Sequence, residues 1–218
     1  MEIVSSVNEL AQLVAEDIFE CYEKAISERG FFSIAISGGN TPKHVFQALV
    51  DEFGQRIDWD NVHIFWTDER MVPPEHADSN YFLACNYLLP SCSGAKVYRI
   101  FGEIEGSESA RAYSETLGEY FDNYDRCIDY MMLGMGDDGH TASLFPNVEY
   151  TSDSDYAVAT KVPVNGHFRV SLTSSVINDA RHRIIMITNN AKWAKFKGEP
   201  ELPVHSIVKH ATTIILIK

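Results

Sequence analysis

The segment FFSIAISGGNTPKHVFQALVDEF, Phe31 to Phe53, indicates most directly how this chain folds. Its first six residues form a short apolar run, typical of a strand that is buried on both faces of a sheet. The run stops at Ser-Gly-Gly, and Thr41 and Pro42 then provide an N-cap and a first-position proline for a helix. A buried strand followed directly by a helix predicts a parallel sheet.

The same alternation extends over the rest of the chain. Apolar runs predict strands at residues 62–67, 96–100, 128–134, 170–173, 183–188 and 212–217. Helices are predicted at residues 79–89, 107–124, 140–145, 175–181 and 191–197, with Ser107 as a cap of the second. The pattern predicts an α/β fold, a single doubly wound, Rossmann-like domain over residues 1–218 with a mostly parallel sheet flanked by helices. The polar segment 147–156 is expected to be a loop inside this domain.

Composition narrows the class of protein. With 45% hydrophobic and 22% charged residues, the 218-residue chain is expected to bury a sizeable core. Its net charge of −13 argues against a nucleic acid or an anionic membrane as partner, and no apolar run is long enough for a membrane helix. The N-terminus is acidic and amphipathic rather than a signal peptide, and the four cysteines lack zinc or redox spacing. We expect a cytoplasmic protein with reduced thiols. If its substrate is an anion, the protein needs a local cluster of Arg and Lys to overcome the repulsion of its net negative charge.

The glycine loop at residues 37–43, SGGNTPK, has two interpretations. Glycines let the backbone approach a ligand, and the helix that follows offers free N–H groups, so the loop is suited to cradle a phosphate. The Walker pattern is absent. The alternative is a turn between strand and helix that needs glycine for backbone reasons alone, and the loop by itself does not separate the two.

A second glycine-rich turn, GMGDDG at residues 134–139, fits the pattern of a dinucleotide site. We reject that interpretation because Asp137 and Asp138 occupy the turn where the pyrophosphate would lie, and their charges would repel it. The pattern also comes late in the chain rather than in the first strand–helix–strand unit.

His140 follows this turn, with Asp138 two residues before it. A carboxylate that accepts the Nδ1 proton leaves Nε2 free as an acceptor, which a general base requires. A metal site would need further ligands at suitable spacing, and a serine nucleophile would need a G-x-S-x-G turn; the sequence has neither. A histidine that only caps a helix remains the plain alternative.

Three charged residues, Asp68, Glu69 and Arg70, end the strand predicted at 62–67. The guanidinium of Arg70 suits phosphate or carboxylate oxygens, and Asp68 is a candidate base or a partner that orients a cation. An isolated cluster of this kind is more often a surface ion-pair group.

Taken together, five segments resemble the 6-phosphogluconolactonase family. They are SGGNTP (37–42), WTDERMVP (66–73), DSNY (78–81), LGMGDDGHTASLFP (133–146) and FRVSLT (168–173), and they occur in the family's order. The resemblance implies hydrolysis of 6-phospho-D-glucono-1,5-lactone to 6-phospho-D-gluconate, a step of the oxidative pentose phosphate pathway, without a metal or another cofactor. It also implies a small sugar-phosphate lactone as the partner, and we favour a monomer.

The resemblance carries roles over to residues of this chain. His140 is the implied general base, held by Asp138 and Gly139. The implied substrate- and phosphate-binding residues are Ser37, Gly38, Gly39, Thr41, Arg70, Arg169 and Lys192. Which cation meets the phosphate, and whether Asp68 acts chemically or orients Arg70, stays open at this point.

Two departures and two alternatives accompany the resemblance. The segment before Arg169 lacks the paired prolines of many members, and Asn-Asn-Ala precedes Lys192 where many have glycines. The first alternative is the sister family of glucosamine-6-phosphate deaminases, whose helix continues H-I-A-F-N-E-P after the histidine, unlike HTASLFP here. The second is a sugar-phosphate sensor without catalysis, although no DNA-binding segment accompanies the chain.

Overall fold

A computed structural model describes residues 1–151, 154–207 and 212–217. The strands are β1 (Glu2–Val4), β2 (Phe32–Ile36), β3 (Val62–Trp66), β4 (Asp68–Arg70), β5 (Lys96–Tyr98), β6 (Tyr130–Gly134), β7 (Ala157–Ala159), β8 (Arg169–Leu172), β9 (His182–Ile187) and β10 (Thr212–Ile217). The helices are α1 (Val7–Arg29), α2 (Asn40–Phe53), α3 (Asn80–Tyr87), α4 (Gly106–Asn123), α5 (Ser174–Asp179), α6 (Asn190–Gly198) and α7 (Pro203–Ser206).

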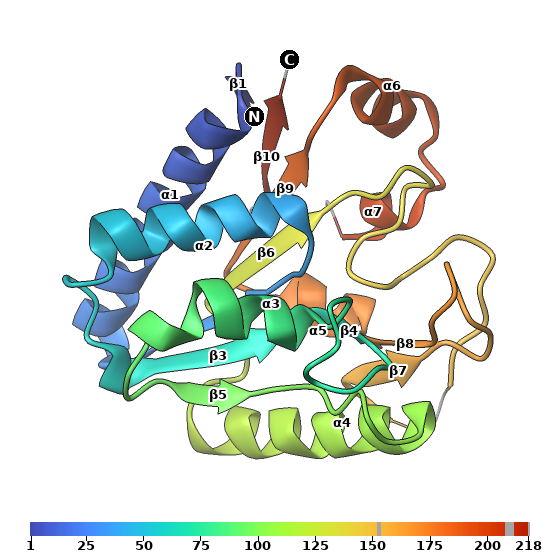
Figure 1. Cartoon of the computed structure of the whole chain (residues 1–218), viewed down its shortest axis with the longest axis horizontal. Coiled ribbons are helices and arrows are strands. Elements are labelled where there is room, and N and C mark those ends of the chain that lie inside the picture. Colours follow the sequence, from blue (N-terminus) through green and yellow to red (C-terminus); the bar gives the residue numbers. More distant parts are fainter. Residues whose placement is uncertain (152–153, 208–211, 218) are drawn as a thin grey trace.

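The centre of the fold is a seven-stranded sheet with the order β1-β10-β9-β6-β2-β3-β5. Its neighbouring strands all run parallel, and every residue of β2 and β3 is buried. Helices flank this sheet, and α1 and α2 pack against each other beside it (Figure 1). The predicted α/β class with a mostly parallel sheet flanked by helices is confirmed.

A second, three-stranded sheet with the order β4-β8-β7 is antiparallel and lies beside the first. The predicted strand at 170–173 and the helix after it are present as β8 and α5, but β8 pairs with the short strands β4 and β7 rather than with the main sheet. The hydrophobic pattern of β8 does not show which sheet the strand joins, because all four of its residues are buried, as in the central strands. Helix α4 contacts β7 and β8.

The strand order places a crevice at the carboxyl ends of the strands in the main sheet. From β2 the chain moves through β3 to β5 on one side, and it then returns through β6 to β9 and β10 on the other side. The order therefore reverses between β2 and β6. In open parallel sheets, loops beyond the carboxyl ends of the strands diverge at such a point and leave room for a ligand.

Several element ends differ from the prediction. Helix α2 begins one residue before Thr41 and takes Gly39 as its N-cap residue, with φ of 105°, while α4 is capped by the carboxylate of Glu105 rather than by Ser107. An L side chain at Gly39 would be strained in this conformation. In the predicted polar loop at 147–156, the described residues 147–151 and 154–156 form no helix or strand, and residues 152–153 lie outside the described part.

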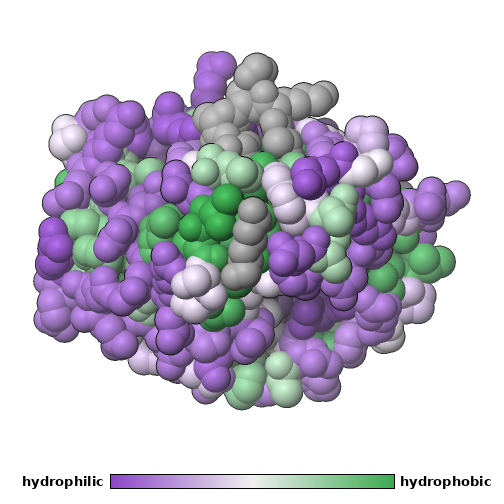
Figure 2. Space-filling model, turned by 90° about the horizontal axis from the view of Figure 1, so that it is seen from above, coloured by the Kyte–Doolittle hydropathy of each residue, from purple (hydrophilic) through white to green (hydrophobic). Residues whose placement is uncertain are grey.

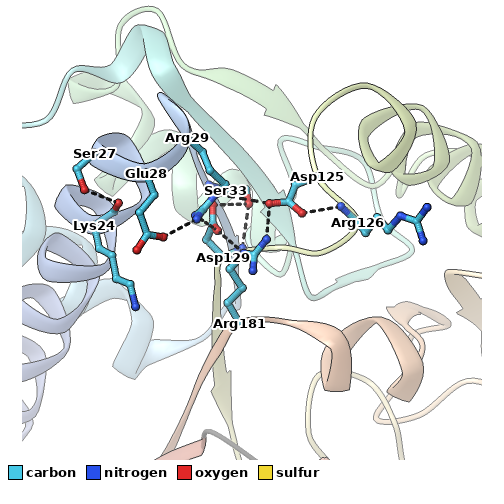
Figure 3. Close-up of polar contacts among 9 residues, drawn as sticks. All are labelled: Lys24, Ser27, Glu28, Arg29, Ser33, Asp125, Arg126, Asp129 and Arg181. Carbon is cyan, nitrogen blue, oxygen red and sulfur yellow. Dashed lines mark hydrogen bonds and ion pairs between the residues drawn. The ribbon is translucent and has the colours of Figure 1, made fainter.

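At the amino ends of the strands, opposite the crevice, a network of ion pairs joins four segments (Figure 3). The Asp129 carboxylate, which is 4% exposed, accepts hydrogen bonds from the backbone N–H and hydroxyl of Ser33 at 2.9 and 3.1 Å. It also pairs with the guanidiniums of Arg29 and Arg181, both of which reach Asp125 as well. Because a buried carboxylate is costly without such partners, this network fixes the end of α1 against the starts of β2, β6 and β9.

The surface is mostly hydrophilic in the view of Figure 2, with hydrophobic side chains gathered in one area near its centre. Within the described residues, no helix is long and apolar enough to cross a membrane. The four cysteines, Cys21, Cys85, Cys92 and Cys127, are free thiols.

Candidate functional site

A polar pocket of about 250 Å³ lies where the loops after β2, β6 and β9 meet the β4 segment. Two other hollows in the described part are larger, at about 390 Å³ each. The smaller, polar pocket is the one lined by the loops that follow β2, β6 and β9, at the crevice described above. The lining residues are Ser37, Gly38, Gly39, Asn40, Thr41, Pro42, Asp68, Arg70, Asn80, Gly134, Met135, Gly136, His140, Ala142, Met186, Thr188 and Lys192. Of the predicted site residues, Asp138, Gly139 and Arg169 lie outside this lining.

His140 lines the pocket with 28% of its side chain exposed. Its Nδ1 lies 2.5 Å from Oδ1 of Asp138, and the same oxygen accepts the backbone N–H of His140 at 3.1 Å. Burial alone would raise the pKa of Asp138, but the hydrogen bonds and charge of His140 outweigh burial and lower that pKa. An ionised Asp138 therefore accepts the Nδ1 proton, and Nε2 is left as the acceptor.

The backbone around His140 is a tight turn rather than the predicted helix at 140–145, and that prediction was wrong. Gly139 has φ of +85° and Ala142 has φ of +47°, so the chain twice takes the left-handed conformation. Gly136 meets the ring closely, because a Cβ there would lie 2.1 Å from two atoms of His140. The ring also contacts Phe145, with centroids 4.5 Å apart.

Long-range contacts explain why this segment is not helical. The hydroxyl of Ser143 donates to Oδ2 of Asp68 at 2.6 Å, and its backbone N–H donates to the hydroxyl of Ser171 at 3.2 Å. The hydroxyl of Tyr150 accepts the N–H of Phe145 and donates to the carbonyl of Ser143. These partners satisfy backbone and side-chain groups outside a helix, so helical spacing in the sequence was misleading.

Asp68 is held within the protein rather than paired with Arg70. Besides Ser143, its carboxylate accepts the hydroxyl of Thr67 at 3.1 Å, and its backbone carbonyl accepts the amide of Asn80 at 2.8 Å. It is 8% exposed and lines the pocket. Within the described residues, the guanidinium of Arg70 instead donates to the carbonyl of Asp78 at 2.7 Å. Of the two roles considered for Asp68, orientation of Arg70 by direct contact is not seen.

Glu69 is buried and has a local structural role. Its carboxylate accepts the backbone N–H groups of Arg70, Asn80 and Tyr81 and the hydroxyl of Ser79, at 2.7 to 3.0 Å. Burial raises its pKa, although these four donors oppose the shift. By satisfying free N–H groups at the start of α3, Glu69 anchors that helix beside the pocket.

The glycine loop forms one wall of the pocket and leads into the N-terminus of α2. Among the described residues, no side chain caps that terminus, and its first turn carries no acidic residue, so its N–H groups and positive dipole end are available to an anion. Gly38 is required by a close approach, because a Cβ there would lie 1.8 Å from Oδ1 of Asn80. The hydroxyl of Ser37, however, donates inward to the carbonyl of Met132 at 2.6 Å.

Three cations approach the pocket in different ways. Arg70 lies on its wall, and Arg169 is its register partner across β4 and β8. Arg169 is 6% exposed, and its Nη1 has no hydrogen-bond partner among the described residues. Burial, followed by the charge of Arg70, lowers the pKa of Arg169. Lys192, on α6, donates to the carbonyl of Met135 at 2.8 Å and lies 3.5 Å from the carboxylate of Asp137.

Three polar side chains on the lining, Asn40, Asn80 and Thr188, had no role predicted from the sequence. Asn80 belongs to the DSNY segment that supported the resemblance, so its position was visible although its contact with Asp68 was not. Within the described residues, the one cluster of three metal-ligating side chains lies away from this pocket, at Asp17, Cys21 and His182.

Comparison with protein families gives one match over nearly the whole chain. The family described as "Glucosamine-6-phosphate isomerases/6-phosphogluconolactonase" matches residues 5–215. A curated 6-phosphogluconolactonase of Treponema pallidum is 32% identical over 209 residues, covering 94% of this chain and 87% of that protein. The 6-phosphogluconolactonase of Haemophilus influenzae is 36% identical over 184 residues, covering 83% of this chain and 78% of that protein.

Solved structures agree with the sequence comparisons. A crystal structure of a 6-phosphogluconolactonase from Shewanella baltica superimposes with a TM-score of 0.85 at 27% identity, covering 100% of this chain and 97% of the other. The structure of the 6-phosphogluconolactonase from Trypanosoma cruzi also gives a TM-score of 0.85 at 27% identity, covering 100% and 94% of the two chains.

Proposed function

The chain belongs to the family of glucosamine-6-phosphate isomerases and 6-phosphogluconolactonases, and from this premise we propose that it is a 6-phosphogluconolactonase. It hydrolyses 6-phospho-D-glucono-1,5-lactone to 6-phospho-D-gluconate in the oxidative pentose phosphate pathway. The relatives named above are 6-phosphogluconolactonases by name, and each aligns with most of this chain. The observation that supports the proposal best is that His140, Arg70 and Lys192 line one pocket.

In the proposed reaction, a water molecule attacks the carbonyl carbon of the lactone. Nε2 of His140 takes a proton from that water as the new C–O bond forms, and the carbonyl oxygen becomes negatively charged. The tetrahedral intermediate then collapses, the bond to the ring oxygen breaks, and the imidazolium returns its proton to that oxygen. Asp138 supports both steps because its ionised carboxylate fixes the ring and stabilises the imidazolium.

The proposed anion clamp comprises Arg70, Lys192 and the N-terminus of α2. A phosphate accepts charge-assisted hydrogen bonds from cationic side chains and from free N–H groups at a helix start. Arg169 adds positive charge beside Arg70, its register partner across β4 and β8, and its Nη1 has no hydrogen-bond partner among the described residues. Such short contacts offset the repulsion that a net charge of −13 imposes on an anionic substrate.

Asp68 is proposed to position groups rather than to transfer a proton. Its carboxylate is already hydrogen-bonded to Thr67 and Ser143, and Ser143 follows His140 by three residues. It thereby links the β4 segment to the turn that carries the base. Gly38 and Gly39 are proposed to admit the substrate close to the backbone, and Thr41 lies on the same wall.

A coupled assay tests this function. Freshly generated 6-phosphogluconolactone is offered to the purified chain, the 6-phosphogluconate formed is measured through its dehydrogenase, and the spontaneous opening of the lactone is subtracted. We expect hydrolysis well above that background and no release of ammonia from glucosamine 6-phosphate. Ammonia release without lactone hydrolysis would identify the deaminase activity of the sister group, and binding without turnover would identify a sensor.

We also propose that the protein works in the cytoplasm, which the four free thiols support because that compartment keeps cysteines reduced. We expect one domain and a monomer. Size-exclusion chromatography with light scattering measures the oligomeric state directly, and a mass of twice 24.6 kDa would contradict a monomer.

A further inference from the structure

A second cluster of chemically active side chains lies at the amino ends of the strands, whereas the pocket lies at their carboxyl ends. Asp17 and Cys21 are one turn apart on α1, and His182 is the first residue of β9. The ligand atoms that these three side chains offer all lie within 4.8 Å of one another. The side chains of Asp17 and His182 are 26% and 25% exposed, and Cys21 is partly buried, so solvent reaches the cluster.

The cluster is already ordered by contacts within the protein. Oδ2 of Asp17 lies 2.9 Å from Nε2 of His182 and accepts the hydroxyl of Tyr130 at 2.7 Å. The rings of Tyr130 and His182 stack, with centroids 5.2 Å apart. The carboxylate and imidazole are therefore held together on one side, and the thiol of Cys21 approaches them from the next turn of the helix.

A thiolate, an imidazole and a carboxylate form a donor set that suits Zn²⁺. Zinc binds these ligands at about 2.0–2.3 Å and prefers four of them in a tetrahedron. Donor atoms within 4.8 Å of one another reach that arrangement through side-chain adjustments on the order of 1 Å. A cavity of about 390 Å³, lined in part by Cys21 and His182, provides room for water as the fourth ligand.

The charges around the cluster favour a cation. The negative charges of Asp17, Glu20 and Asp129 act on the thiol of Cys21, and the positive charge of Lys24 partly opposes them. A divalent cation offsets the same negative charges. On the cavity wall, Arg29 and Arg181 are paired with carboxylates, so their repulsion of a cation is reduced (Figure 3).

We propose that Asp17, Cys21 and His182 form a zinc site that joins α1 to β9, with a water molecule as the fourth ligand. Binding forms the Zn–S, Zn–N and Zn–O bonds and releases one proton from the thiol to solvent. When Nε2 binds the metal, the neutral imidazole carries its proton on Nδ1, so the proton that Nε2 shares with Asp17 moves to Nδ1 through solvent. Tyr130 continues to donate to the carboxylate of Asp17. The site is independent of lactone hydrolysis, because it lies at the other end of the strands from His140.

Cobalt substitution tests the site without reference to activity. The 218-residue chain is freed of metal with a chelator and titrated with Co²⁺. One equivalent should produce sulfur-to-cobalt charge transfer in the near ultraviolet and the intense visible bands of four-coordinate cobalt, and Zn²⁺ should remove both. Cys21→Ser should abolish the charge-transfer band, and His182→Gln should weaken binding at least about tenfold. Cys85→Ser, a change at a partly buried thiol on α3, should alter neither.

A second measurement uses the unsubstituted chain, so that the proposal can still be tested if Cys21→Ser does not fold. Stoichiometric Zn²⁺ should protect Cys21, but not Cys85, from alkylation, as followed by mass spectrometry of the peptides. Absence of the charge-transfer band in the wild type, its persistence in Cys21→Ser, or equal alkylation of Cys21 with and without Zn²⁺ would each overturn the proposal. The rate of lactone hydrolysis should not change with metal, so the failure of one proposal does not imply the failure of the other.

Discussion

Oδ1 of Asp138 lies 2.5 Å from Nδ1 of His140, and Asp138 reaches this position from only two residues earlier in the chain. The tight turn around Gly139 makes the contact possible, because the same carboxylate oxygen also accepts the backbone N–H of His140. The pair forms a base whose orientation depends on local backbone geometry, and the predictions below test that arrangement and the charges around it.

Replacement of the imidazole should remove most of the catalysis. His140→Ala should lower kcat by about 10²- to 10⁴-fold, the usual contribution of general-base assistance, because water is then deprotonated only by solvent. The melting temperature should change little, since the ring is partly exposed. The matched control is His44→Gln, a half-buried histidine on α2 outside the pocket lining, which should keep the full rate. A His140→Ala variant with the wild-type kcat would contradict the assignment.

Asp138 should be needed to orient the base. Its lowered pKa keeps the carboxylate ionised, so it accepts the Nδ1 proton and leaves Nε2 as the acceptor. Because this pKa is lowered, the contribution is complete above the ordinary pKa of the carboxyl group and is lost as the pH falls through the lowered value. In Asp138→Asn the ring is no longer held in one tautomer, so we expect kcat to fall while KM changes little. The wild-type kcat in Asp138→Asn would show that Asp138 does not act through His140.

Close packing at Gly136 should be needed for the position of the base. In Gly136→Ala the new Cβ would lie 2.1 Å from atoms of His140, so the ring must move. A displacement on the order of 1 Å costs about 10²-fold in rate. Gly198→Ala is the control, because its added methyl group would meet no other atom within 4 Å. Activity assays and melting curves of both variants check this prediction, and equal rates would contradict it.

The cations should confer selectivity for the phosphate. Loss of one charge-assisted hydrogen bond, worth about 1.5–3 kcal/mol, corresponds to about 10- to 150-fold in affinity. Arg70→Gln and Lys192→Gln should therefore raise KM for 6-phosphogluconolactone and leave the hydrolysis of unphosphorylated gluconolactone nearly unchanged. Lys197→Gln, at the end of α6 and outside the lining, is the control. Equal losses for both lactones would mean that these cations do not meet the phosphate.

Glu69 should matter for stability more than for chemistry. Glu69→Ala leaves four donors without their carboxylate, and each buried unsatisfied donor costs about 1–3 kcal/mol. We expect the free energy of unfolding to fall by about 3 kcal/mol or more, as measured by denaturant titration. Glu115→Ala, an exposed position on α4, should change it by less than about 0.5 kcal/mol. A similar small effect at both positions would rule out the anchoring role.

Much of the main sheet was predictable because its signals are local. The apolar run at Phe32–Ile36 is buried on both faces, and the glycine loop after it leads directly into α2. The second sheet was not predictable in this way. The three residues of β4 are all charged, and their strand conformation depends on hydrogen bonds to β8, about a hundred residues later.

Sequence alone determined the alternation of strands and helices, the glycine turns and the proximity of Asp138 to His140, because each depends on residues that are near neighbours along the chain. Only the tertiary structure decided that Asp68 meets Ser143 and that Arg70 lies beside Arg169, because strand register and loop packing set those contacts. It also replaced the expected helix after His140 with a turn. Hydrogen-bonding partners supplied from distant segments outweighed the local preference, and no pattern within that segment records them.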